Sequence, residues 1–104
     1  ALRADPIRSV EALLDFCAWV RKWGGSAPRV WGNGANFDNV ILRRAFERAH
    51  IKAPWSHRDD RCYRTLKNLR PAIAFEPYGT HHNALDDAFA QARHAEAILA
   101  AMGA

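Results

Sequence analysis

The stretch WGNGANFDNVIL, from Trp31 to Leu42, places a glycine turn between a short apolar run and a helical pattern. The residues RVWG, from Arg29 to Gly32, are mostly β-branched or aromatic and predict a buried strand. Asn36 can cap a helix that runs to about His50, with the inward residues Ile41, Leu42, Ala45, Phe46 and Ala49. Asp38 is then expected in the first helical turn at the carboxyl end of the strand, where α/β folds gather ligand sites.

Three further helices are predicted from apolar residues that recur at helical spacing. The first starts at an N-cap Ser9, another covers Asp59 to Leu69, and the last is capped by Asn83 and ends near Met102. A single strand leaves its backbone N–H and C=O groups unpaired and forms no sheet. Because the chain also has no methionine at residue 1, we expect an upstream segment that carries further strands of the same domain.

The composition is that of one soluble globular domain, with 104 residues, 49% of them hydrophobic and 25% charged. No apolar run approaches the ~20 residues that span a bilayer, and no signal peptide is recognisable, so a cytoplasmic location is expected. Cys17 and Cys62 lie far apart and outside any Cys/His cluster. We expect them to be small buried residues rather than zinc ligands or a disulfide.

Basic residues concentrate between Arg43 and Arg70, where nine Lys or Arg stand against three acids. Such a surplus suits a polyanionic partner such as nucleic acid, although a solvated protein face can have the same composition. Trp31 and Trp55 could stack on bases, but burial in the core is the more usual place for tryptophan.

A second stretch, HHNALDDAFAQARH from His81 to His94, places a histidine and acids at the start of the last helix. His82 can accept a proton near neutral pH, and an ionised Asp87 can hold a divalent cation. Structural roles are the alternatives: Asp38 could support only its own helix terminus, and His82 and Asp87 could merely pair. Three neighbours are expected to lie outside any site, namely the cap or solvent residue Asp86 and the bystanders His81 and His94.

These two stretches resemble the second and third motifs of the DEDD superfamily of 3′–5′ exonucleases, in the subclass with histidine in the last motif. The second motif falls on Asn36, Phe37 and Asp38, and the third on His82 and Asp87. The intervening PWSHRDDRCYRTLK is similar to the branch related to ribonuclease T, which includes phage and bacterial exonucleases. The resemblance covers about residues 30–98 and implies an α/β, RNase H-like (ribonuclease T-like) fold.

The first motif of that family is a strand with the sequence D-x-E, and no D-x-E occurs in these 104 residues. The resemblance therefore implies that residues 1–104 are the C-terminal portion of a single 3′–5′ exonuclease domain, mostly helical as it stands. It also implies that this portion alone is inactive or nearly so.

The resemblance further implies hydrolysis of DNA or RNA from a single-stranded 3′ end by a two-metal mechanism. Mg²⁺ or Mn²⁺ would be held by Asp38 and Asp87, with His82 as the general base. Asn36 and Phe37 would lie beside the substrate, although core packing is the preferred assignment for the Phe37 ring. Arg64 and Lys67 would contact phosphates.

The expected partners are nucleic acid, a second copy of the chain or the upstream fragment of the same protein, and no membrane. Two alternatives remain from other functional classes. One is a non-catalytic nucleic-acid-binding or protein-interaction module that retains the exonuclease scaffold, and the other is a structural domain that needs no metal.

Overall fold

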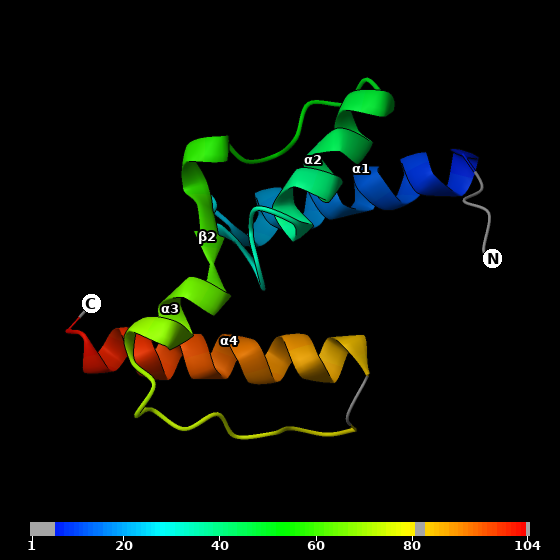
Figure 1. Ribbon diagram of the computed structural model, residues 1–104. Coiled ribbons are helices and arrows are strands. Elements are labelled where there is room, and N and C mark those ends of the chain that lie inside the picture. Colours follow the sequence, from blue (N-terminus) through cyan, green and yellow to red (C-terminus); the bar gives the residue numbers. More distant parts are fainter. Residues whose placement is uncertain (1–5, 81–82, 104) are drawn as a thin grey trace. The chain divides into compact units, whose positions relative to one another are not determined.

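The computed structural model describes residues 6–80 and 83–103. The chain forms two compact units, Ala1–Arg61 and Cys62–Ala104 (Figure 1). Each unit has its own cluster of buried side chains.

The first unit contains two helices and a small sheet. Its elements in chain order are α1 (Pro6–Trp23), β1 (Val30–Gly32), α2 (Asp38–Arg48), the 3₁₀ helix η1 (His57–Asp59) and β2 (Asp60–Cys62). β1 and β2 pair to form a two-stranded sheet. The expectation of only one strand was wrong, because a three-residue strand is too short to show alternation and Asp60–Cys62 fell within the helix predicted from Asp59 to Leu69.

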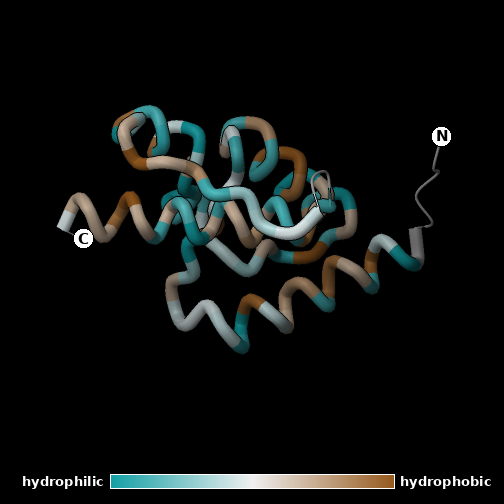
Figure 2. The backbone as a smooth tube through the Cα atoms, turned by 90° about the horizontal axis from the view of Figure 1, so that it is seen from below, coloured by the Kyte–Doolittle hydropathy of each residue, from teal (hydrophilic) through white to brown (hydrophobic). Residues whose placement is uncertain are grey.

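α1 is amphipathic, and Figure 2 shows hydrophobic and hydrophilic residues alternating along it. The spacing of its inner stripe matches one helical face, with the members Leu13, Phe16, Cys17 and Val20. The described helix already includes the three residues before Ser9, so the prediction of Ser9 as its N-cap was wrong.

The core of the first unit joins α1, α2 and the segment before η1. Cys17, Phe46 and Trp55 are buried, and the rings of Phe46 and Trp55 meet edge-on with centroids 6.1 Å apart. The ring centroid of Phe16 lies 6.2 Å from each of these two rings. The predicted burial of Cys17 and Trp55 is confirmed, whereas Cys62 is only half-buried.

Three apolar residues that were predicted to face inward are exposed: Trp31 at 39%, Phe37 at 66% and Ile41 at 54%. On α2 the cause is Asn39, a polar residue that is only 3% exposed. With Asn39 and Phe46 on the inner face of the helix, Ile41 is turned outward. Apolar residues alone therefore do not identify the inner face of α2.

The second unit consists of α3 (Tyr63–Leu69) and α4 (Ala84–Ala101), which pack against each other. Tyr63, Leu66, Ala95 and Ile98 form its core. α3 is shorter than the predicted helix because η1 and β2 occupy the residues from His57 to Cys62. Leu69, the last residue of α3, is 56% exposed although the apolar spacing of this helix places it with Leu66 on the inner face.

The segment between α3 and α4 returns along α4 (Figure 1). The ring of Phe75 stacks edge-on against His94 with centroids 5.6 Å apart, and the ring of Tyr78 lies 4.5 Å from that of Phe89. The bounds of α4 and its N-cap at Asn83 follow the prediction, whereas Leu85 and Met102, which the apolar spacing places on the inner face, are 78% and 41% exposed.

Within residues 6–80 and 83–103, no helix is long and apolar enough to cross a membrane. The mostly helical α/β content is confirmed. The RNase H-like arrangement stays a prediction.

Candidate active site

Asp38 is the first residue of α2, directly after the glycine turn. The carbonyl of Gly34 accepts hydrogen bonds from the N–H groups of Phe37 and Asp38, at 2.9 and 3.0 Å. The backbone therefore closes this helix start, and the predicted side-chain cap from Asn36 is wrong. Gly34 has φ of 90°, a conformation that favours glycine.

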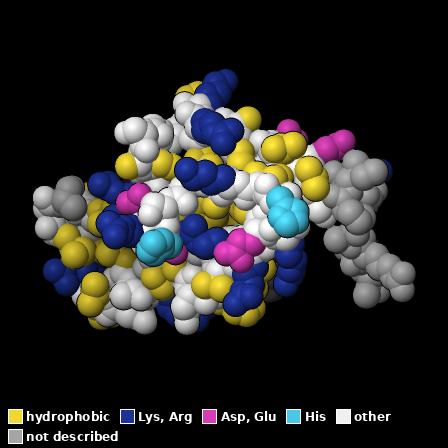
Figure 3. Space-filling view, turned by 90° about the horizontal axis from the view of Figure 1, so that it is seen from above, with side chains coloured by type: hydrophobic (Ala, Val, Ile, Leu, Met, Phe, Trp, Pro, Cys, Tyr) yellow, Lys and Arg dark blue, Asp and Glu magenta, His cyan; other side chains and the backbone are white. Residues whose placement is uncertain are grey.

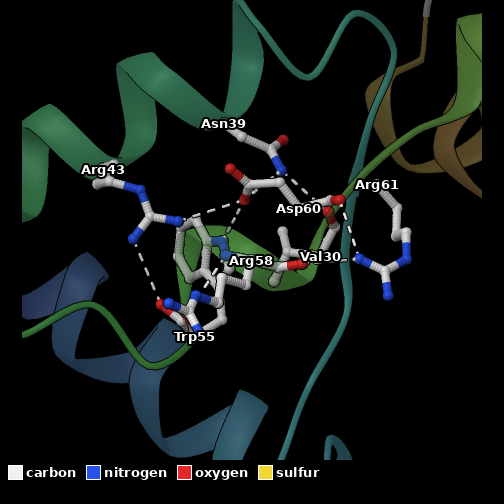
Figure 4. A network of polar contacts seen from close by, with 8 residues as sticks. Val30, Asn39, Arg43, Trp55, Arg58, Asp60 and Arg61 are labelled. Atoms are coloured by element: carbon white, nitrogen blue, oxygen red, sulfur yellow. Dashed lines mark hydrogen bonds and ion pairs between the residues drawn. The ribbon is translucent and has the colours of Figure 1, made fainter.

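The start of α2 is anchored by a polar network in the first unit (Figure 4). The Asn39 amide nitrogen donates to the carbonyl of Val30 at 2.9 Å and to Asp60 Oδ1 at 3.0 Å. The same Asp60 oxygen accepts from Trp55 Nε1 at 2.5 Å and from Arg43 Nη2 at 3.3 Å. The Asp60 carboxylate and its donor Asn39 thus link β1, α2 and β2.

The environment of Asp60 keeps it ionised. Burial raises the pKa of the Asp60 carboxyl, but hydrogen bonds from Trp55 and Asn39 and the charge of Arg43 outweigh burial, and the pKa lies below its ordinary value of 3.8. Arg43 also lies over the Trp55 ring at 4.7 Å and donates to the Trp55 carbonyl at 3.4 Å. Cation and carboxylate are therefore held together by the aromatic core.

Asp87 lies in the first turn of α4, in the second unit. Its N–H donates to the carbonyl of Asn83 at 2.9 Å, and its side chain is half-buried. Asp86 instead ties down the helix start, because its carboxylate accepts from the Thr80 N–H at 2.9 Å and its own N–H donates to the Asn83 side chain at 3.1 Å. The prediction of Asp86 as a capping residue is confirmed.

Asp38 and Asp87 share a chemical property that Asp60 and Asp86 lack. Among the described residues, no hydrogen bond or ion pair engages the carboxylate of either Asp38 or Asp87. Both are ionisable oxygen donors at helix starts, which fits a hard divalent cation. Since they belong to different units, whether they meet stays a prediction. His82, the third predicted member, lies outside the described residues.

Over the part of the chain that the structure describes, no three side chains of His, Cys, Asp or Glu gather into a metal-binding cluster. Two carboxylates are also fewer than two adjacent divalent ions need. The described residues alone therefore do not form a complete site for two such ions, and the role of Asp38 and Asp87 as metal ligands stays a prediction.

The residues predicted to touch substrate are at the surface or near it. Asn36 and Phe37 are exposed in the turn that leads into α2. Arg64 is exposed on α3, and Lys67 is half-buried with its ammonium group 5.4 Å from the centre of the Tyr63 ring. An exposed phenylalanine beside Asp38 replaces the core assignment that the sequence favoured.

A groove of about 590 Å³ opens on the first unit, between the end of α1 and the segment before η1. The groove is lined by two basic residues, two serines and one acid, namely Arg21, Lys52, Ser26, Ser56 and Asp59. Within the described residues, the side chains of Arg21 and Lys52 have no bonded partner. On the face drawn in Figure 3, basic side chains lie among acidic and hydrophobic ones.

Comparison with protein families gives a match that covers nearly the whole chain. Residues 2–99 match the model of the 3′–5′ exoribonuclease Rv2179c-like domain. The chain belongs to this family. No curated protein and no solved structure matches it. The predicted kinship with 3′–5′ exonucleases is thereby confirmed for the Rv2179c-like family, whereas the histidine subclass of the DEDD superfamily stays a prediction.

In this Rv2179c-like domain, sequence reasoning missed two groups of residues. The first is the Asn39–Asp60 network, because Asp60 was assigned to a helix and Asn39 was given no inward position.

The second is His94, which is only 7% exposed. The Nε2 atom of His94 lies 2.9 Å from the carbonyl of Ile73. Because a carbonyl oxygen can only accept, Nε2 donates this hydrogen bond. In the neutral ring Nδ1 then accepts from the Tyr63 hydroxyl, which lies 2.6 Å away. His94 is therefore a core residue of the second unit.

Proposed function

We propose that this chain provides part of the active site of a 3′–5′ exoribonuclease that removes nucleotides from the 3′ end of single-stranded RNA. The observation that carries the proposal is the family match over residues 2–99. The unengaged carboxylates of Asp38 and Asp87 support it, since each lies at a helix start in one of the two motifs.

Asp38 and Asp87 are proposed to hold Mg²⁺ or Mn²⁺. Two such ions, bound by these and further carboxylates, would activate the attacking water and stabilise the leaving 3′ oxygen. The chain contains no D-x-E, so we propose that the remaining carboxylates come from a preceding segment of the same RNase H-like domain. Residues 1–104 would then be the C-terminal portion of that domain.

His82 is proposed to take the proton from the attacking water, because imidazole titrates near neutral pH. It lies five residues before Asp87 in the sequence, just ahead of α4. Removal of this proton acceptor should slow the chemical step more than it weakens RNA binding.

The RNA itself would be held by phosphate contacts and by stacking. Arg64 and Lys67 are proposed to contact phosphates, and Arg21 and Lys52 offer two further cations in the groove of the first unit. Phe37 is proposed to stack on the terminal base, since its ring is 66% exposed next to Asp38.

A non-catalytic RNA-binding module is the second candidate, because the chain has no D-x-E of its own. An assay of the natural full-length protein on 5′-labelled single-stranded RNA with Mg²⁺ or Mn²⁺ separates the two. The enzyme produces a ladder that shortens from the 3′ end and disappears with a chelator. RNA that is bound but never shortened would favour the module.

A further inference from the structure

The position of Asp38 depends on how closely the first turn of α2 approaches β1. Gly32 makes this approach possible: a Cβ at Gly32 would collide with Asn39 Oδ1 and lie 3.1 Å from the Cβ of Asp38. The strand end and the helix start are therefore in direct contact at Asp38 and Asn39. Any shift of Asn39 would move Asp38, its chain neighbour, by a similar distance.

Asn39 is fixed from two sides. Its amide nitrogen donates to the Val30 carbonyl in β1 and to the Asp60 carboxylate in β2. The residue is only 3% exposed, so water offers little replacement for a lost partner. Asp60 is thus the acceptor that orients Asn39 relative to the sheet.

Asp60 is in turn held by two other donors. Trp55 Nε1 and Arg43 Nη2 both donate to the Oδ1 atom that accepts from Asn39. Arg43 lies one helical turn after Asn39 on the same side of α2, so a single carboxylate oxygen binds two successive turns of that helix. In Figure 4 the three donors converge on Asp60 from α2 and from the Trp55 segment.

We propose that Asp60 is a positioning residue for Asp38. It fixes the first turn of α2 on the sheet through Asn39 and Arg43, and it sets where the Asp38 carboxylate is presented to a divalent cation. This inference rests on the proposed function of Asp38. Some residues orient a metal ligand without binding the metal themselves. Their replacement commonly lowers metal affinity or activity by about 10- to 100-fold.

The test compares Asp60→Asn with Glu47→Gln in the natural full-length protein. Glu47→Gln is the matched control, because it removes one exposed acid from α2 outside the network. We expect Asp60→Asn to raise the Mg²⁺ concentration for half-maximal activity about tenfold and to lower kcat about tenfold, with KM for RNA unchanged. Mn²⁺ affinity, measured by electron paramagnetic resonance without substrate, should weaken in parallel. Circular dichroism confirms that both variants are folded at the assay temperature.

Trp55→Phe provides a milder variant, since it removes one donor to Asp60 and keeps the aromatic core. Trp55→Phe should raise the Mg²⁺ concentration for half-maximal activity by a smaller factor than Asp60→Asn does. If Asp60→Asn does not fold, Trp55→Phe is the variant that tests the proposal. Mg²⁺ dependence and Mn²⁺ affinity that match wild type in the folded variants would overturn the positioning role. If Asp38→Asn also leaves Mn²⁺ affinity unchanged, the proposed function itself fails, so the two failures are distinguishable.

Discussion

Asn39 and Asp60 are joined by a 3.0 Å hydrogen bond that connects the first turn of α2 with the start of β2. The two residues are 21 positions apart, and neither is apolar. Their bond closes the first unit around Trp55, whose indole nitrogen donates to the same carboxylate oxygen. A polar contact therefore organises the sheet–helix junction from which Asp38 emerges.

The first prediction concerns stability. Asn39→Ala should lower the free energy of unfolding by about 1–3 kcal/mol, because it leaves the partly buried carbonyl of Val30 and the carboxylate of Asp60 short of a donor. Asn36→Ala should change it by less than about 0.5 kcal/mol, since the Gly34 carbonyl and not Asn36 closes the start of α2. Urea unfolding of both variants measures this. Equal losses would contradict the capping that the structure shows.

Much of the backbone could be predicted from the sequence. α1, β1, α2 and α4 follow from apolar periodicity, glycine punctuation and the cap at Asn83, because these signals are local. β2 was missed because its three residues pair with β1, and that partner lies far away in the sequence. Ile41 was misplaced because hydrophobicity alone does not reveal that the polar residue Asn39 fills a core position.

The candidate site could be predicted only in part. Asp38 and Asp87 could be named as candidate metal ligands because acids in first helical turns have a local signature and because the two motifs resemble those of a known family, and that role stays a prediction. The network behind Asp38 has no such signature, since Asn39, Trp55 and Asp60 meet only after folding. The sequence predicts the candidate ligands, and the structure adds the hydrogen-bond network at the start of α2 next to Asp38.

The second prediction concerns pH. Because the folded pKa of Asp60 lies below its ordinary value of 3.8, the carboxylate contributes stability above that value and loses it as the pH falls through the folded pKa. The difference in melting temperature between wild type and Asp60→Asn should therefore be largest near neutral pH and shrink below about pH 4. Thermal melts across this range measure it. A difference that grows toward acid pH would contradict the assigned charge state.

The third prediction separates chemistry from binding in the full-length protein. His82→Ala should lower turnover by ~10²- to 10⁴-fold with little change in RNA affinity, because it removes a proton acceptor. His81→Ala is the neighbouring control. Arg64→Ala should instead weaken binding and reduce the slope of log affinity against log salt by about 0.7. Fluorescence anisotropy at several salt concentrations measures RNA binding, and single-turnover rates measure the chemical step. Equal effects of His82→Ala and Arg64→Ala on binding would refute these roles.

The fourth prediction concerns the 104 residues alone. With Asp38 and Asp87 but no D-x-E, they offer too little negative charge to hold two adjacent divalent ions. We expect little or no cleavage of single-stranded RNA by this portion. Activity should return when the preceding segment is supplied in the same chain or as a separate peptide. Robust metal-dependent activity of the isolated portion would show that the active site lies elsewhere.

The most direct test of the proposed metal site is a Mn²⁺ titration of the full-length protein, followed by electron paramagnetic resonance. Wild type, Asp38→Asn and Asp87→Asn are compared, with Asp15→Asn on α1 as a control acid. If the two carboxylates share one site, each of the first two substitutions should weaken Mn²⁺ binding, and the double variant should lose little more than either alone. Asp15→Asn should bind as wild type does. Binding that is unchanged in both single variants would contradict the assignment of Asp38 and Asp87 as metal ligands.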